Sequence, residues 1–278
     1  MSQQETIADL LLARLVSERE NIETQWRNPV GTKTRQFVVD DLLPRGDCDA
    51  IFQAFPRDAE GFFSRDSFRE KKRTSADLGA YPTILNDITY AFQDPRIVEI
   101  VGSLTGIDHL EPDPKFYAGG LSMMFEGDFL NQHVDNSHDA ERERYRRLNL
   151  LYYVSPDWKT QNGGNFELWD DNRKISKTVL SAANRLLVME TTRSSWHSVS
   201  PVVAETARCC ISNYYFSQNS PVQADYFHVT SFTGRPEQYL RRLLSLVDNP
   251  LRSLLSKILK TGRGKKLVND PAEQPSSK

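Results

Sequence analysis

The sequence of 278 residues has few cysteines and histidines, and it lacks long hydrophobic runs. Its three cysteines, Cys48, Cys209 and Cys210, are odd in number and fit no spacing of a thiolate metal site. We therefore expect reduced thiols packed in a core and a reducing, cytoplasmic location. No run of about 18 apolar residues occurs, so the sequence predicts no membrane-spanning helix. The first residues are polar and acidic, which is not typical of a signal peptide.

The chain also lacks a strong net charge. A value of −2 at pH 7 favours neither a nucleic acid nor an acidic membrane as partner, and we expect no nucleic acid. The length suffices to bury a large core without disulfide support. No pattern in the sequence specifies an oligomeric state.

Helical patterns lie at both ends of the chain, and short β-rich runs fill its middle. Residues 3–25 carry apolar side chains at helical spacing, 45–56 predict a short helix, and 75–106 predict two more. From 113 to 217, β-rich runs alternate with turn signals such as "SPDW" and "NGG". The order predicts a mainly β fold, a double-stranded β-helix (jelly roll, cupin-like) with N-terminal and C-terminal helices packed outside.

These patterns divide the chain into four parts. We expect a helical segment over 1–33, the jelly-roll domain over 34–232, a helical extension over 233–263 and a polar tail over 264–278. Residues 235–266 hold nine lysines and arginines. They predict either helices packed on the barrel with a solvated basic face, or a surface for peripheral contact with a membrane or an acidic partner.

Two charge-dense runs interrupt the middle of the chain. The run "FREKKRT" at 68–74 is either a solvated basic loop or a contact for an anionic substrate. The run "SHDAERERYRR" at 137–147 predicts a solvated loop or short helix between strands.

The stretch "GDFLNQHVDNSH" holds His133 and Asp135, separated by one residue. In a strand, residues i and i+2 point to the same face, so both side chains can reach one ion. His197, in "SSWHSVSP", is the candidate third ligand. Two histidines and a carboxylate form the facial triad that binds non-haem Fe(II) and leaves positions open. A zinc hydrolase could use the same three ligands.

Arg208 opens the apolar run "ARCCISNYYF", where a guanidinium is unexpected unless it is paired. Its planar fork suits a carboxylate, so it could hold one end of a dicarboxylate whose other end chelates the metal. Tyr153 and Ser212 could add hydrogen bonds to the same end. A structural ion pair for Arg208, and simple packing for Tyr153 and Ser212, are the alternatives.

In this order the motifs carry a resemblance. The segments "FEGDFLNQHVD", "YYVSPDW…GGNFELW" and "WHSVSP…R" are similar to the prolyl 4-hydroxylase-like branch of the 2-oxoglutarate and Fe(II)-dependent oxygenases. The likeness spans roughly residues 115–217. A His-x-Asp pair alone would be weak, but a later histidine followed by an arginine eleven residues on makes the pattern specific.

The resemblance implies roles for particular residues. His133, Asp135 and His197 would be the iron ligands, and Arg208 would pair with the distal carboxylate of 2-oxoglutarate, assisted by Tyr153. Phe125 departs from the family, which often has a tyrosine there. The presence of Asp135 argues against halogenation, because halogenating relatives have Gly or Ala at this position.

The implied activity is that of the family, an Fe(II)- and 2-oxoglutarate-dependent dioxygenase (hydroxylase). It consumes O2 and 2-oxoglutarate, releases succinate and CO2, and admits ascorbate as an accessory reductant. We expect a small-molecule substrate rather than a protein. A prolyl-type protein hydroxylase, and a non-catalytic jelly-roll binding module, are the alternatives.

Overall fold

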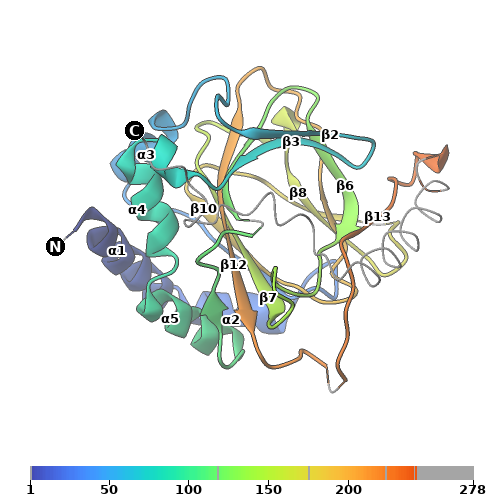
Figure 1. Ribbon diagram of the computed structural model, residues 1–278, viewed down its shortest axis with the longest axis horizontal. Coiled ribbons are helices and arrows are strands. Elements are labelled where there is room, and N and C mark those ends of the chain that lie inside the picture. The colour runs from blue at the N-terminus through green and yellow to red at the C-terminus, as the bar shows by residue number, and fades with distance from the viewer. Residues whose placement is uncertain (1, 118, 175, 223, 241, 243–278) are drawn as a thin grey trace.

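The computed structural model describes residues 2–117, 119–174, 176–222, 224–240 and 242. Figure 1 shows its helices gathered on one side of a large, strongly curved sheet, while β6, β8 and β13 lie on the other side. The mainly β, jelly-roll class predicted from the sequence is confirmed. Within the described part of the chain, no helix is long and apolar enough to cross a bilayer.

Five α-helices lie within the first 105 residues of the chain. They are α1 (Gln3–Ser17), α2 (Arg19–Arg27), α3 (Arg45–Gln53), α4 (Thr83–Ala91) and α5 (Pro95–Thr105), with 3-10 turns at Leu78–Ala80 and Thr160–Asn162. Helix α5 has clear end signals. The Asp94 side chain accepts a hydrogen bond from the Arg96 amide at 2.9 Å, Pro95 follows, and Gly106 ends the helix with φ 64°.

The prediction of one helix over residues 3–25 is wrong in detail, because the chain turns at Glu18 and continues as α2. The turn lets α2 lie against α5, where the indole Nε1 of Trp26 donates to the backbone carbonyl of Thr105 at 2.8 Å. Periodicity alone does not reveal such a turn, since both helices keep apolar spacing.

Thirteen strands form one antiparallel sheet within the described residues. They are β1 (Gln36–Val39), β2 (Phe63–Asp66), β3 (Glu70–Ser75), β4 (Glu111–Pro112), β5 (Gly120–Met124), β6 (Phe129–Val134), β7 (Tyr145–Tyr153), β8 (Phe166–Trp169), β9 (Ser176–Val179), β10 (Arg185–Glu190), β11 (His197–Val199), β12 (Arg208–Ser217) and β13 (Ser231–Phe232). The main order is β1-β10-β7-β12-β5-β3-β6-β11-β8-β9, with β2 on β3, β4 on β12 and β13 on β6.

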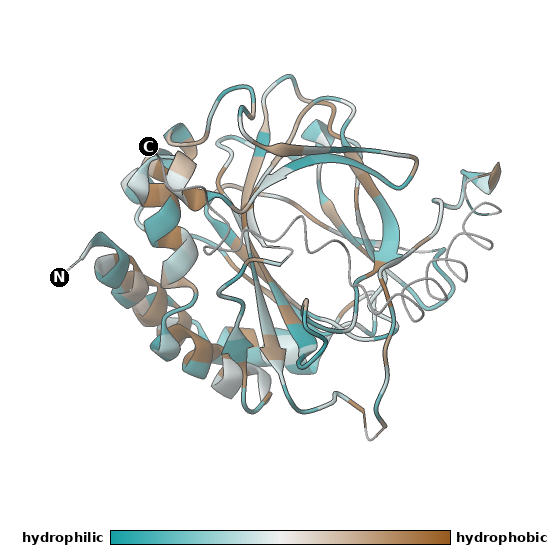
Figure 2. Ribbon diagram, viewed as in Figure 1, coloured by the Kyte–Doolittle hydropathy of each residue, from teal (hydrophilic) through white to brown (hydrophobic). Residues whose placement is uncertain are grey.

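The two faces of this sheet have different roles. On β7, Leu148, Leu150 and Tyr152 pack into the core beneath the helices. The alternate residues Asn149 and Leu151 line a cavity on the opposite face. Figure 2 shows the apolar stripes of the helices that cover the first face. Strand alternation thus separates a structural core from a polar interior.

The charge-dense runs match the predicted solvated loops only in part: 137–144 do form a loop, but each run also enters a strand. Most of 68–74 belongs to β3, an inner strand between β5 and β6, and its Glu70 is buried. The end of 137–147 belongs to β7, where Arg146 and Arg147 are buried. Strand pairing places these charged residues beside residues that are distant from them in the sequence.

Residues 243–278, which hold most of the predicted helical extension and the polar tail, lie outside the described residues. The four-part division of the chain stays a prediction.

Candidate metal centre

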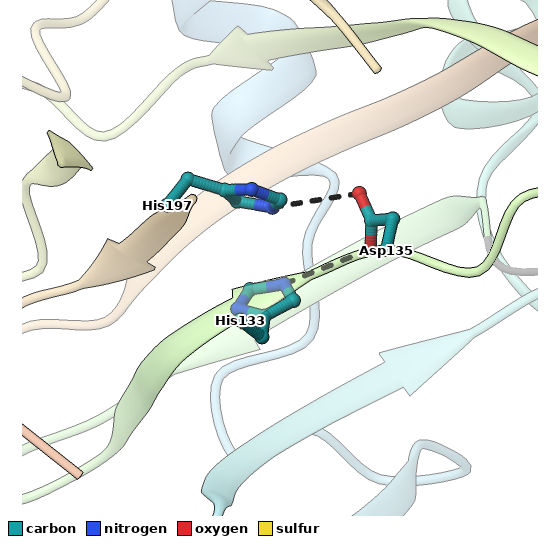
Figure 3. Close-up of side chains that lie close together, drawn as sticks. All are labelled: His133, Asp135 and His197. Atoms are coloured by element: carbon teal, nitrogen blue, oxygen red, sulfur yellow. Dashed lines mark ion pairs between the residues drawn. The ribbon is translucent and has the colours of Figure 1, made fainter. Parts of the chain in front are cut away.

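Two neighbouring strands bring His133, Asp135 and His197 together. His133 lies near the end of β6, Asp135 follows the strand, and His197 begins β11 directly opposite His133. Figure 3 shows the two imidazoles and the carboxylate converging. The Nε2 atoms of His133 and His197 lie 3.6 and 3.4 Å from the Asp135 oxygens. All three side chains are buried, and one ligand atom from each lies within 4.8 Å of the others.

Backbone carbonyls fix the orientation of both imidazoles. The Nδ1 atom of His133 lies 2.9 Å from the carbonyl oxygen of Asn131, and that of His197 lies 2.9 Å from the carbonyl of Ser195. A carbonyl can only accept, so each Nδ1 carries the proton and donates it. Each Nε2 is therefore left with its lone pair aimed at the centre, the form that binds a metal.

The ionisation states also suit a cation. Burial and the neighbouring His197 lower the pKa of His133 to about 3, and burial lowers the pKa of His197. Burial alone would raise the pKa of Asp135, but Arg146, the two histidines and a hydrogen bond from Asn149 together lower it below its ordinary value. The site thus offers two neutral imidazoles and a carboxylate at neutral pH.

Two residues that the sequence did not single out hold Asp135 in place. The Asn149 amide donates to Oδ2 of Asp135 at 2.8 Å, and a guanidinium nitrogen of Arg146 lies 3.4 Å from the same oxygen. Arg146 in turn donates to the Asn149 side-chain oxygen at 2.8 Å and lies over the ring of Tyr214. Asn149 could have been noticed as the one amide in the apolar run "LNLLYY", whereas Arg146 was hidden in a charge-dense run.

Replacing Asn149 by alanine should weaken binding of a divalent ion by about 10- to 100-fold, because partners that orient a metal ligand typically contribute that much. Binding of Mn²⁺ can be followed by calorimetry. Asn213→Ala is the matched control, since Asn213 is a buried asparagine on β12 with no contact to Asp135. Equal losses in the two variants would contradict the positioning role of Asn149.

Arg208 begins β12 and is 3% exposed. Its Nε donates to the Ser181 hydroxyl at 3.2 Å, one Nη faces the Met124 sulfur at 3.5 Å, and its guanidinium lies 4.7 Å from the ring centre of Tyr153. Among the described residues, no carboxylate lies within ion-pair distance of Arg208. The structural ion pair considered for this residue is therefore not found there, and a buried cation without an anion indicates an anionic ligand.

The turn "NGG" packs directly against this arginine. Gly163 and Gly164 have φ of 69° and 62°, as expected for a glycine turn. A Cβ at Gly164 would lie 2.8 Å from Cδ of Arg208 and 3.0 Å from Cγ2 of Val202. The glycine therefore leaves the space that the arginine side chain occupies.

Replacing Gly164 by alanine should displace Arg208 and weaken binding of a ligand held by it roughly tenfold, the effect of losing one charge-assisted hydrogen bond. Gly127→Ala is the matched control, because Gly127 also has a positive φ, 78°, but its Cβ would meet nothing within 4 Å. Similar weakening in both variants would point to general backbone strain instead.

Tyr153 and Ser212 occupy different positions around Arg208. Ser212 lies on the same face of β12 and lines the cavity with it. Tyr153 is fully buried beneath the guanidinium, and burial raises the pKa of its phenol. The Tyr153 hydroxyl makes no hydrogen bond of good geometry to the described residues, so it retains the capacity to donate. Tyr152 points the other way, into the helix-covered core, as the alternation predicts.

Two cavities meet at the metal site. The inner cavity extends from the triad to Arg208 and Ser212 and includes Asn149 and Cys210. The outer cavity extends from the triad toward β2 and β3, and it includes Arg146 and Phe232. Phe232, on β13, stacks on the His133 ring with 5.1 Å between ring centres. The triad thus lies between an inner and an outer binding space.

The remaining histidines stay outside this group. His109 is exposed, and His138 and His228 lie in an aromatic cluster with Tyr145 and Tyr226. Among the described residues, His133, Asp135 and His197 form the group of ligand side chains close enough to hold a metal ion. This donor set fits a facial Fe(II) site, because such sites use two imidazoles and one carboxylate. Zinc would accept the same ligand atoms, but a zinc site would leave the buried Arg208 without a function.

Comparison with known proteins agrees with this geometry. Residues 119–216 match the family model described as "2OG-Fe(II) oxygenase superfamily". A segment of 96 residues is 31% identical to mouse (Mus musculus) prolyl 3-hydroxylase OGFOD1, covering 32% of this chain and 17% of that protein. The chain therefore spans about a sixth of the length of this curated relative.

Solved structures show the same fold at low sequence identity. A Pseudomonas putida prolyl-4-hydroxylase is 15% identical with a TM-score of 0.53, covering 74% of this chain and 100% of that one. A structure of prolyl 4-hydroxylases from Phytophthora capsici is 14% identical with a TM-score of 0.50, covering 90% and 78%.

Proposed function

We propose that this protein, whose residues 119–216 match the family model of the 2OG-Fe(II) oxygenase superfamily, is an Fe(II)- and 2-oxoglutarate-dependent dioxygenase. It would hydroxylate an unactivated C–H bond and release succinate and CO2. The observation that carries the proposal is the inner cavity, which has a facial set of metal ligands at one end and a buried arginine at the other.

Residues that line or adjoin the inner cavity have distinct roles in this proposal. His133, Asp135 and His197 would hold the iron, which supplies the oxidation chemistry when bound together with O2. Arg208 would pair with the distal carboxylate of 2-oxoglutarate, and Ser212 and the Tyr153 hydroxyl would donate hydrogen bonds beside it. Asn149 and Arg146 would keep Asp135 oriented. The apolar side chains of Leu151 and Phe166 limit water in this space.

The substrate class is a finer proposal, and we favour a small polar molecule. The outer cavity, on the other side of the metal site, is lined mainly by charged, amide and hydroxyl side chains. A prolyl residue of a protein is the second candidate, because the mouse relative and the Pseudomonas putida protein are both named prolyl hydroxylases. The observations support a zinc hydrolase or a non-catalytic module less well, since neither function uses the buried Arg208.

Succinate formation tests this function directly. Purified protein with Fe(II), 2-oxoglutarate and ascorbate should form succinate slowly on its own and faster when a substrate is present, with a gain of one oxygen atom detected by mass spectrometry. Ascorbate is included as a proposed reductant, and its omission measures whether it is needed. A metabolite extract and a panel of proline-containing peptides, assayed in parallel, would separate the two substrate classes.

The alternatives predict other results. A zinc hydrolase would consume no 2-oxoglutarate and would be activated by Zn²⁺. A binding module would produce no succinate with either substrate pool while still binding a ligand.

A further inference from the structure

Residues 228–235 lie along the strand that carries the metal ligand His133, and we call this segment the strap. Strand β13 pairs with β6, where Phe232 lies directly opposite His133 (Figure 1). One residue further on, the Thr233 amide donates to the Gln132 carbonyl at 2.8 Å. The strap therefore follows the metal-binding strand residue by residue.

Ser137 holds the first end of the strap. The Ser137 amide donates to the carbonyl of His228 at 3.1 Å, and the Ser137 hydroxyl accepts a hydrogen bond from the His228 amide at 2.9 Å. Ser137 is buried and follows the ligand Asp135 by two residues. This end of the strap is thus fixed beside a second metal ligand.

Arg235 holds the other end against the strands around the third ligand. Its guanidinium donates to both carboxylate oxygens of Glu167 on β8, at 2.5 and 3.2 Å, and to the Val199 carbonyl on β11 at 3.3 Å. Only 11% of each side chain of this ion pair is exposed. Glu167 also accepts from the hydroxyl of Ser198, the neighbour of His197, at 2.6 Å. Such a bidentate pair is both strong and geometrically specific.

Phe232 is the strap residue that faces the metal site. Its ring lies nearly parallel to the His133 imidazole, with an angle of 20° between the planes, and it lines the outer cavity. Phe166 covers the His197 ring in a similar way from the inner cavity, with 5.4 Å between ring centres. The Phe232 ring therefore takes up space in the outer cavity directly beside a metal ligand.

The middle of the strap has little secondary structure to hold it. Strand β13 is two residues long, and so short a strand supplies few backbone hydrogen bonds. Elements of this kind open locally at a small cost in free energy. The contacts at Ser137 and Glu167 therefore help to keep Phe232 over the metal site.

We propose that the strap closes one side of the outer cavity, that Phe232 limits the size of the molecule that can reach the metal, and that the Arg235–Glu167 pair keeps the strap closed. The inference rests on the proposed function and specifies its substrate as a molecule that is slender at the carbon to be oxidised. Release of Arg235 would let Phe232 move away from β6 and would admit bulkier molecules.

The size limit can be tested with the full chain loaded with Co²⁺ and 2-oxoglutarate, because the visible absorption of cobalt reports a new ligand. Imidazole and 4-phenylimidazole are the probes, since both bind metals through a ring nitrogen and differ by one phenyl group. Wild-type protein should bind imidazole at least about tenfold more tightly, a typical cost of bulk that a pocket does not accommodate. Phe232→Ala should lose most of this preference, because the space of the ring becomes available.

The ion pair is tested with the same probes. Arg235→Gln should reduce the preference for imidazole, because the strap then moves away from β6 more easily. Arg235→Lys should retain more of it, since lysine keeps the charge beside Glu167. Arg35→Gln is the matched control, because Arg35 forms a bidentate pair with Glu190, at 2.7 and 2.6 Å, that lines neither cavity. This variant should keep the full preference.

Hydrogen exchange follows the strap itself in metal-free protein. Arg235→Gln should accelerate exchange of the Thr233 amide by about tenfold, because a charge-assisted contact that holds the strap is lost. Arg35→Gln should leave this exchange unchanged. Thermal melting shows whether each variant is folded, and Phe232→Leu replaces the alanine variant if that one unfolds.

Equal affinity for the two probes in the wild type, or a preference that persists in Phe232→Ala, would overturn the role of Phe232. The same loss of preference in Arg35→Gln as in Arg235→Gln would overturn the role of the ion pair. These results would leave the proposed function intact, since they concern access to the metal. A wild-type cobalt spectrum that does not respond to 2-oxoglutarate would refute the proposed function instead, while exchange of the Thr233 amide still tests the strap.

Discussion

Replacing His133 by alanine should lower the affinity for a divalent ion by at least about 100-fold and abolish succinate formation. The reason is geometric: His133 and His197 face each other across β6 and β11, and the Nε2 atom of each lies within 3.6 Å of an Asp135 oxygen. Loss of a partner that merely orients a ligand costs about 10- to 100-fold, so loss of a ligand should cost more. Calorimetric titration with Mn²⁺ measures the affinity without turnover.

The control for this experiment is His109→Asn. His109 is exposed, lies outside the metal site and has a positive φ of 54°, which asparagine tolerates. This variant should bind Mn²⁺ like the wild type. If His133→Ala bound the ion as tightly as His109→Asn, the assignment of the metal centre would be wrong.

Replacing Arg208 by glutamine should weaken 2-oxoglutarate binding by about 100- to 4000-fold while leaving Mn²⁺ binding nearly unchanged. Removing one partner of a buried, hydrogen-bonded ion pair costs about 3–5 kcal/mol, which corresponds to a loss of that size. Arg208→Lys should give an intermediate loss, because lysine keeps the charge but not the planar fork. Titration of 2-oxoglutarate into Mn²⁺-loaded protein measures both effects.

Arg185→Gln is a suitable control for Arg208. Arg185 lies on β10 opposite Tyr153 and pairs with Asp40 at the surface, so its loss should not alter 2-oxoglutarate binding. A weak effect of Arg208→Gln, comparable with that of Arg185→Gln, would mean that the anion-binding role of Arg208 is mistaken.

The sequence predicts that His133, Asp135 and His197 lie together, because this arrangement depends on the local alternation of side chains along strands. The i, i+2 spacing of His133 and Asp135 places both on one strand face, and "WHSVSP" offers a third donor after a buried strand. The alternation that separates Tyr152 from Tyr153 follows from the same rule. Gly106 marks the end of α5 because glycine adopts its positive φ readily.

The positions of Lys72 and Arg146 depend on pairing between distant strands, which cannot be predicted from local sequence patterns. Lys72 and Arg146 belong to charge-dense runs that are typical of solvated surface, yet both line the outer cavity. Lys72 lies there because β3 is inserted between β5 and β6. Arg146 is buried because β7 begins earlier than its apolar pattern suggests, and the Asp135 carboxylate then lies within its reach. Charge density alone therefore does not reveal which of these side chains line a cavity.

The most direct test of the central claim is an anaerobic titration of Fe(II) and 2-oxoglutarate, followed by visible absorption. Chelation of Fe(II) by a 2-oxo acid gives a charge-transfer band. We predict that this band forms at one equivalent of each component in the wild type, weakens strongly in Arg208→Gln and is absent in His133→Ala. No band in the folded wild type, or a band of equal strength in all three proteins, would contradict the account.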